Sequence, residues 1–388
     1  MAEILAILRN TGAAVREETV EGTLIAEQAA DAILLGAEGV EFNLGRELLE
    51  SSFMTGSLSK SAPVAGMWSD DVGWTIPTFA RGAGILASGL PDYHVPLKSL
   101  MGQEESNTDN TVNVSPAPTA IAFTTGSSND MVVGQLIRVN SEITRITSVA
   151  TDALTVWPPL SAIPSGTDVI TAGKNFMLAS SGWPSFSSYI YFDGPKRLAL
   201  AGGRTTTLNM NFTVGQRCPL TFSVRSLQPY YDVTSRAVTP TLDTTTAPPV
   251  CLGMTLSTTF VAVATGTPTT TETILLAPNF HVAVDDEILL ETSAGVWETE
   301  TISAISGDPP GNLTLTHSAV SGSAVSATDT LYIRRKKCAG IGDTLEVTIE
   351  MEVTPQLCMQ ASAGKMAAVP TSRTVTLSKT PYFSSWQE

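Results

Sequence analysis

The sequence predicts a mainly β protein: a β-sandwich or barrel with one short α-helix and two small inserted β-domains. Thr and Val recur along the chain, and Gly, Pro, Asn and Asp interrupt it at short intervals, as in short strands joined by turns. Helix-forming residues gather in two short segments. Two further stretches resemble each other in their strand pattern. A chain of 388 residues is long enough for two or three domains.

Alternating apolar and polar residues predict a framework of strands that runs from the first third of the chain to its end. Such strands fit an antiparallel sandwich or barrel that carries one helix. The predicted strands are 40–43, 73–79, 188–192, 206–212, 220–224, 344–351 and 374–377.

Two segments carry helical signals. Pro96 to Gly102 predicts a short helix, because proline suits the first turn of a helix and glycine ends it. Leu24 to Leu35 has good helix formers and is followed by Gly36. It predicts either a helix or an extended arm that orders against a partner.

Two polar segments, 103–118 and 239–250, predict linkers because they are rich in Thr, Asn, Asp and Pro. The stretch after each linker has the same order of strands and turns, with a Glu-x-Thr-like strand start and a late Asp. We interpret these stretches as two copies of one β-module, against the alternative of chance similarity between strands. The predicted domains are a core at 1–115, 174–250 and 338–388 with an N-terminal arm at about 1–37, module 1 at 116–173 and module 2 at 251–337.

No motif predicts a catalytic site, a metal centre or a cofactor, so we expect a protein that is not an enzyme. The four cysteines are far apart and the three histidines are scattered. Asp70-Asp71 and Asp285–Glu287 fit turn positions. The one basic run is either a solvated strand end or a contact with an acidic neighbouring subunit, with nucleic acid the least favoured reading. It consists of Arg334, Arg335, Lys336 and Lys337.

The charge balance is acidic. Lys and Arg number 22 and Asp and Glu number 37, which gives a net charge of −15, and residues 1–110 hold 16 acids and 6 bases. This balance argues against sequence-specific binding of nucleic acid, which needs clustered basic residues. No stretch approaches the roughly 20 apolar residues of a membrane-spanning helix.

Five segments together carry a resemblance to a known family. An acidic stretch runs into Gly-Thr at Glu17–Thr23, and a short strand at Gly39–Phe42 precedes a long loop. A strand at Trp74–Gly82 precedes the proline-started helix within Leu90–Gly102, and long alternating strands run through Ser188–Val224. In this combination the framework resembles the major tail tube proteins of long-tailed bacteriophages.

The resemblance implies a structural virion protein that forms stacked hexameric rings of a tail tube. Each subunit would add strands to a continuous inner barrel, which removes exposed sheet edges. An acidic lumen would repel phosphate, so DNA would pass as transient cargo during ejection without specific binding. The implied partners are further copies of the chain, a tape measure protein, and tail completion or baseplate proteins. The implied location is the virion tail, after assembly in the host cytoplasm.

The resemblance also implies positions for the contacts. The arm and a loop at about 43–62 would reach the neighbouring ring, and the two modules would lie on the tube exterior as small β-barrels. One alternative is another virion β-protein, such as a baseplate, tail terminator or decoration subunit. A second is a carbohydrate-binding or adhesive β-sandwich. The inter-ring candidates are Glu17, Glu18, Glu21, Arg46, Glu47, Glu50 and Lys60, and the basic run is a possible subunit contact.

Overall fold

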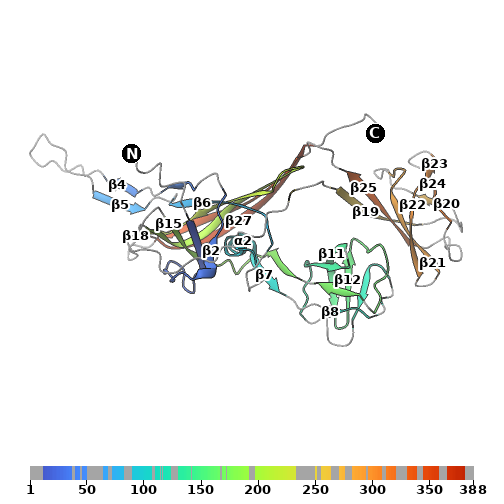
Figure 1. Cartoon of the computed structure of the whole chain (residues 1–388), viewed down its shortest axis with the longest axis horizontal. Helices are drawn as coiled ribbons and strands as arrows, with labels where there is room; N and C mark the ends of the chain where they lie inside the picture. The colour runs from blue at the N-terminus through green and yellow to red at the C-terminus, as the bar shows by residue number, and fades with distance from the viewer. Residues whose placement is uncertain are drawn as a thin grey trace, which may run out of the picture. The chain divides into compact units, whose positions relative to one another are not determined.

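The chain is described by a computed structural model that divides into two compact units (Figure 1). Unit 1 contains Met1–Glu104, Leu178–Gly253 and Gly340–Glu388, and unit 2 contains Glu105–Met177 and Met254–Ala339. The domain ends expected from the sequence differ most from these at the first cut, 115 against 104. The structure describes residues 12–36, 40–43, 46–49, 64–68, 72–82, 90–106, 110–113, 115, 117–123, 130–140, 142–166, 168–171, 173–191, 197–232, 250, 255–263, 271–275, 282–293, 296–307, 312–319, 330–338, 344–357 and 365–380.

The prediction of a mainly β fold is confirmed. In unit 1, ten strands form one antiparallel sheet in which β16 pairs with four neighbours: β15, β17, β18 and β26. The strands are β1 (Gly12–Glu17), β2 (Ala32–Ile33), β3 (Phe42–Asn43), β6 (Gly73–Phe79), β15 (Phe186–Tyr191), β16 (Arg197–Thr213), β17 (Pro219–Arg225), β18 (Gln228–Asp232), β26 (Thr344–Leu357) and β27 (Lys365–Thr380).

The sheet bends where β16 changes partners. Before Gly202, β16 pairs with β15 and β18, and beyond Gly203 it pairs with β17 and β26. Gly202 has a φ of +66°, and a Cβ there would lie 2.5 Å from the Leu227 side chain. A Cβ on Gly203 would lie 2.7 Å from the Phe186 carbonyl oxygen. Glycine is therefore required at both positions for the sheet to curl.

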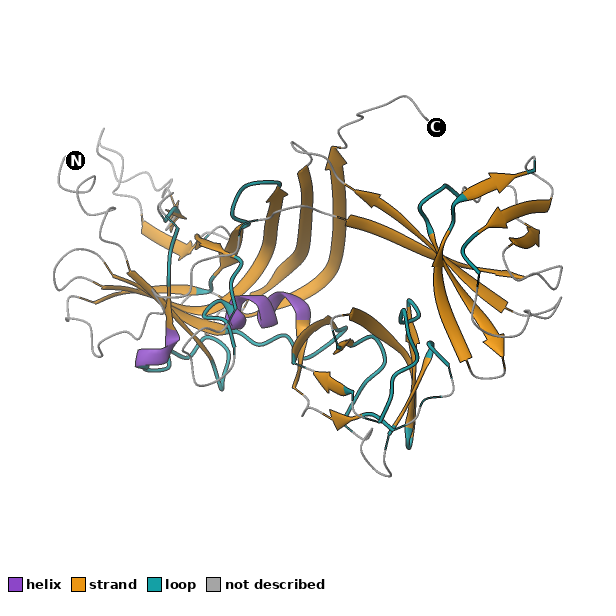
Figure 2. Cartoon of the chain, turned by 45° about the vertical axis from the view of Figure 1, so that its right-hand side comes forward, coloured by secondary structure: helices purple, strands orange, loops and turns teal. Residues whose placement is uncertain are grey.

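The curl encloses one hydrophobic core. Phe186 and Ile190 of β15 lie in the same buried cluster as Ile76 of β6, Leu208 of β16 and Phe222 of β17. Strands before and after the bend therefore face each other across this core, which is the arrangement of a sandwich. Figure 2 shows the long curved strands of this unit with the helix beside them.

Helix α2 (His94–Met101) is the one α-helix among the described residues. It ends as predicted, because Gly102 takes a φ of +92° and donates its N–H to the Lys98 carbonyl. It begins two residues before Pro96, which lies in the first turn, where its missing N–H costs no hydrogen bond. Arg373 of β27 donates to the carbonyls of Leu100 and Met101 at 3.0 and 3.1 Å and so caps the helix end.

The helical alternative for 24–35 is wrong. Only a 3-10 turn, η2 (Ala29–Asp31), and strand β2 form there. The N–H of Ile25 donates to Ser187 Oγ at 3.2 Å, and its carbonyl accepts from the Tyr189 hydroxyl. These bonds to β15 take the place of helical bonds, so the segment lies extended along the sheet.

Four short strands form two further ribbons: β4 (Arg46–Leu49) pairs with β5 (Val64–Trp68), and β7 (Gly102–Ser106) pairs with β14 (Lys174–Leu178). The predicted linker 103–118 is therefore partly wrong, because it contains most of β7 and also β8. The predicted linker 239–250 lies outside the described residues apart from Val250.

The two inserts in unit 2 have the same strand order. We call 105–177 module 1 and 254–339 module 2. In module 1 one sheet has the order β8-β13-β10-β11-β12-β9, and in module 2 two sheets, β19-β25-β21-β22 and β23-β24-β20, follow this order when they are read one after the other. Their strands are β8 (Asn110–Thr111), β9 (Ala120–Ala122), β10 (Leu136–Val139), β11 (Glu142–Ala150), β12 (Ala153–Trp157), β13 (Val169–Thr171), β19 (Thr255–Val263), β20 (Thr271–Leu275), β21 (Glu287–Ser293), β22 (Val296–Thr301), β23 (Ala304–Ser306), β24 (Asn312–Thr316) and β25 (Thr330–Cys338).

The turn before β10 and the turn before β21 have the same hydrogen bonds. In module 1, Gly134 N donates to Ile146 O at 2.8 Å and Ile146 N donates to Gln135 O at 2.9 Å. In module 2, Asp285 N donates to Ile302 O and Ile302 N donates to Asp286 O, both at 2.9 Å. Gly134 and Asp285 also share a positive φ, +97° and +73°. These bonds align the two modules residue by residue at this point.

Candidate functional site

Glu18, one of the predicted inter-ring residues, is buried and accepts four hydrogen bonds within its own subunit. Its Oε1 accepts from Ser187 Oγ at 2.9 Å and from Gly202 N at 2.8 Å. Its Oε2 accepts from Gly22 N and Ser185 Oγ, both at 2.8 Å. Such a buried acceptor needs its donors, so Glu18 fastens the N-terminal segment to the bend of β16.

Glu21 and Glu17 are also bound within the subunit. Glu21 makes a two-point pair with Arg204, with Nη2 to Oε2 at 2.8 Å and Nε to Oε1 at 3.2 Å, and its Oε1 accepts from Ala368 N at 2.8 Å. Glu17 pairs with Lys98 at 2.8 Å on the surface. Two-point carboxylate–guanidinium pairs hold a fixed geometry. Glu21 therefore ties the N-terminal segment to both β16 and β27.

The remaining predicted residues divide between described and undescribed parts. Arg46 and Glu47 belong to β4, whose side chains are not described, and Glu50 and Lys60 lie outside the described residues. Arg334 begins the basic run and is described in full. Arg335, Lys336 and Lys337 continue strand β25, with side chains outside the description.

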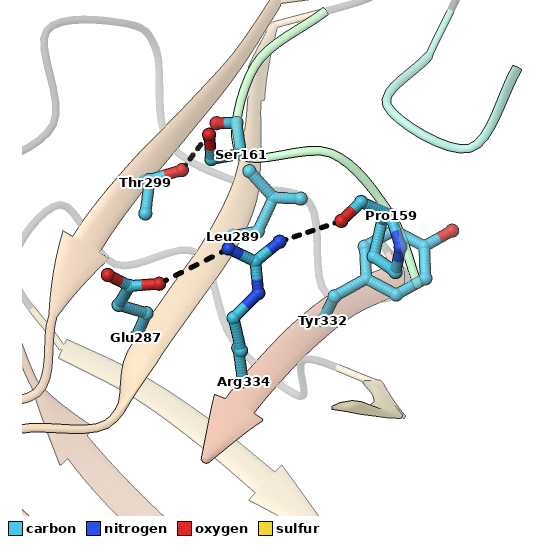
Figure 3. A pocket seen from close by; sticks show the side chains of 7 residues that line it. All are labelled: Pro159, Ser161, Glu287, Leu289, Thr299, Tyr332 and Arg334. Carbon is cyan, nitrogen blue, oxygen red and sulfur yellow. Dashed lines mark hydrogen bonds and ion pairs between the residues drawn. The ribbon is translucent and has the colours of Figure 1, made fainter. Parts of the chain in front are cut away.

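Arg334 lies at a joint between the two modules (Figure 3). Its Nη2 donates to the Pro159 carbonyl at 2.7 Å and lies 3.5 Å from Glu142 Oε2, both in module 1. Its Nη1 lies 3.5 Å from Glu287 Oε2 in module 2. One guanidinium thus reaches one acid from each module and a backbone carbonyl, which uses the several donors that arginine carries.

Polar and aromatic contacts extend this joint. Thr299 Oγ1 donates to the Ser161 carbonyl at 2.6 Å. The Tyr332 ring lies near two tryptophans, with its centroid 6.0 Å from that of Trp157 and 5.6 Å from that of Trp297. The hollow among these residues offers about 10 Å³, room for about one water molecule. The place is therefore a packed joint and not a ligand pocket.

A second feature is the solvent face of the sheet in unit 1. Along β26 the exposed Glu346, Glu350 and Glu352 alternate with the apolar residues of the core face. Rows of Thr, Ser and Asn flank them on β16 and β27, as in the cross-strand set Asn209, Thr348, Thr376. A hollow of about 340 Å³ lies beside Glu350 and is lined also by Arg225. The face is hydrophilic, mostly uncharged and acidic in balance.

Among the described strands, the part of this sheet beyond the bend of β16 ends in β27 and β3, and the part before the bend ends in β2 and β18. At one end β27 pairs with β26 alone over its 16 residues. Its Val375 and Leu377 are 51% and 66% exposed, although they lie opposite Ile349 and Val347 of the core face. At the other end the two-residue β3 exposes Phe42. An open edge with exposed apolar side chains is a surface suited to another chain.

Sequence reasoning identified Arg334 and the acids of the N-terminal segment, but it missed the acidic face and the open edge. The signal for the face was present, since Glu346-Val347-Thr348-Ile349-Glu350 alternates strictly. The part of the chain that the structure describes holds no group of three His, Cys, Asp or Glu side chains arranged for a metal ion. None of its helices is long and apolar enough to cross a membrane.

Comparison with known proteins adds no relative to this description. No known protein family matches the chain, and no curated protein is significantly similar to it in sequence.

Proposed function

We propose that the chain is a ring-forming structural subunit of a bacteriophage tail tube. In this proposal copies join edge to edge through unit 1, the rings stack into a tube in the virion tail, and DNA passes along the acidic sheet face. The observation that carries the proposal is the part of the unit 1 sheet beyond the bend of β16, which has one hydrophilic face and, among the described residues, two different edge strands, β3 and β27.

The open edges support a ring in preference to a twofold dimer. The part of the sheet beyond the bend of β16 ends in different strands, β3 at one side and β27 at the other. Contact between unlike edges is head-to-tail, and head-to-tail contacts close into rings when the rotation permits. Burying Val375 and Leu377 against the next copy would remove apolar surface from water, and pairing β27 would satisfy the unpaired backbone groups of its outer edge.

The solvent face supports passage of DNA without retention. Its charged groups include Glu346, Glu350 and Glu352 on β26, and Arg225 is a single base at the hollow beside them. A polyanion gains affinity from clustered Lys and Arg, whose contacts release counterions, and a glutamate-rich wall repels phosphate. The acids of the N-terminal segment contribute less to such a wall, because Glu18 and Glu21 are occupied within the subunit.

Negative-stain microscopy of the purified chain tests ring formation. We expect rings or tubes from the wild type and none from a variant with Val375→Asp and Leu377→Asp, because charges at a buried edge are costly. The matched control is Thr376→Asp, which places one charge on the opposite face of the same strand and should leave rings intact. A wild type that stays monomeric at high concentration would contradict the proposal.

Retention of DNA tests the role of the face. Assembled wild-type particles should not bind duplex DNA, and particles with Glu346→Lys, Glu350→Lys and Glu352→Lys should bind it in a salt-dependent way. A control with three exposed threonines of β27 changed to serine should behave as wild type. Equal DNA binding by the wild type and the lysine variant would mean that DNA does not contact this sheet face.

A further inference from the structure

Module 1 has an open sheet face at the place where module 2 has its joint. The shared turn aligns the two, since Leu136 follows Gln135 as Glu287 follows Asp286. Two residues along each strand, Arg138 corresponds to Leu289. The sheet face that bears Glu287 and Leu289 in module 2 therefore corresponds to the face that bears Leu136 and Arg138 in module 1.

The neighbouring strands agree with this alignment. Ile143 of β11 lies opposite Arg138, as Thr299 of β22 lies opposite Leu289. Across the other neighbour, Arg334 of β25 lies opposite Glu287. The residues that hold the 157–161 segment of module 1 therefore belong to one sheet face of module 2, and module 1 repeats that face with other side chains.

The repeated face in module 1 is uncovered. Leu136 is 52% exposed and Ile143 is 64% exposed, and Val169 of β13 is exposed beside them. Arg138 and Arg145 are exposed among these apolar residues, and neither has an ion pair within the described residues. By contrast Leu289, the counterpart of Arg138, is buried in the joint. The open face combines apolar area with two unneutralised guanidinium groups.

We propose that this open face of module 1 binds a second copy of the chain. Its two arginines stand in a chain whose net charge is −15, so an acidic copy complements them. The apolar part exceeds what isolated surface residues explain, because three large aliphatic side chains lie on adjoining strands. The equivalent face of module 2 already binds a polypeptide segment, residues 157–161 of module 1. Binding of another polypeptide by the corresponding face of module 1 would therefore repeat an interface that the structure already contains.

This contact goes beyond the proposed ring, whose contacts lie in unit 1. It adds a belt of contacts between the modules of neighbouring copies. Arginine with aliphatic neighbours is a composition favoured at protein interfaces. Because the patch is basic and apolar, we expect the contact to weaken with added salt only in part.

Photo-crosslinking of the full chain tests the proposal. A benzophenone amino acid replaces Ile143, and the protein is a mixture of normal and heavy-isotope copies, so that crosslinks between copies can be recognised by mass. The same probe at Ser306, an exposed position of module 2, is the control. We expect crosslinks between copies from position 143 at least tenfold above the control. Crosslinks within one copy only, or to a different protein only, would overturn the proposal.

A variant series separates this proposal from the proposed ring. Ile143→Asp with Arg145→Glu should weaken self-association of the full chain about tenfold, measured by sedimentation, whereas Thr147→Asp on the same strand should not. Rings without any copy-to-copy crosslink from position 143 would overturn the docking face and leave the ring standing. Crosslinks without rings would support the docking face and count against the tail tube.

Discussion

Modules 1 and 2 share one backbone plan and differ in the face it presents. In both modules a residue of positive φ, Gly134 or Asp285, precedes a buried polar residue, Gln135 or Asp286. The carbonyl of this polar residue accepts a hydrogen bond from the amide of Ile146 in module 1 and of Ile302 in module 2. Both side chains also accept from the turn: Gln135 Oε1 from Val132 N at 3.2 Å and Asp286 Oδ2 from Ala283 N at 2.8 Å. The turn thus needs a side-chain oxygen acceptor at this position, and either an amide or a carboxylate can supply it.

The difference lies outside the turn. At the position after it, module 2 has Glu287, which pairs with Arg334, the residue that contacts module 1, whereas module 1 has the exposed Leu136. The polar residues that bond the turn, Gln135 and Asp286, are buried, and the residues that contact a neighbour are on the face. A repeated fold can thus acquire separate contacts through a few outward positions while its interior hydrogen bonds stay the same.

The largest effect is expected from truncating the two corresponding core residues. Ile146 and Ile302 are both fully buried, in the cores of module 1 and module 2. Ile146→Ala and Ile302→Ala should each lower the free energy of opening of their own module by about 2–5 kcal/mol, measured by hydrogen exchange of its amides in the full chain. Ile143→Ala, on the exposed face, is the control and should change it by less than about 0.5 kcal/mol.

The two cores are separate clusters, so each truncation should leave the other module protected. Equal loosening of both modules by either substitution would mean that they unfold as one body. Unit 2 would then behave as a single cooperative core.

A smaller effect is expected at the joint. Arg334→Met removes the contacts to Glu142, Glu287 and the Pro159 carbonyl. The ion pairs are partly exposed, so a double-mutant cycle between Arg334→Met and Glu142→Gln should give a coupling of only about 0.2–1 kcal/mol. Exchange should rise in residues 157–161 and stay unchanged in both cores. Arg145→Met in module 1 is the matched control.

A cycle without any coupling would mean that the Glu142 pair adds nothing to the joint. The hydrogen bond of Arg334 to the Pro159 carbonyl and the aromatic contacts of Tyr332 would then hold it.

The sequence predicted best those elements whose signals are local. Strand β6 was predicted at its observed ends, and helix α2 ends where Gly102 can adopt a positive φ. The segment 24–35 was ambiguous because its partners are distant: Ser187 and Tyr189 hold Ile25 extended from more than 160 positions away. Local propensity cannot contain that information.

The charged residues of the candidate site could be predicted from the sequence, but their hydrogen-bond and ion-pair partners could not. Glu18 was singled out as an inter-ring contact of the arm, yet its donors include Gly202 N, 184 positions away. Arg334 was singled out for its charge, and its acid Glu142 lies 192 positions before it. Single-sequence patterns report which residues carry charge. Which charges are used inside the subunit depends on long-range packing, which only the structure supplies.

A further small effect concerns the positive-φ position itself, and it should have opposite signs in the two modules. Asp285 takes a φ of +73°, a region that costs a residue with a Cβ about 1 kcal/mol and costs glycine little. Asp285→Gly should therefore stabilise module 2 by up to about 1 kcal/mol, and Gly134→Asp should destabilise module 1 by a similar amount. Hydrogen exchange at Ile302 and Ile146, whose amides bond the two turns, reports each change. If both substitutions destabilise, the Asp285 side chain contributes a contact that glycine cannot replace, and the two turns are alike only in their backbone.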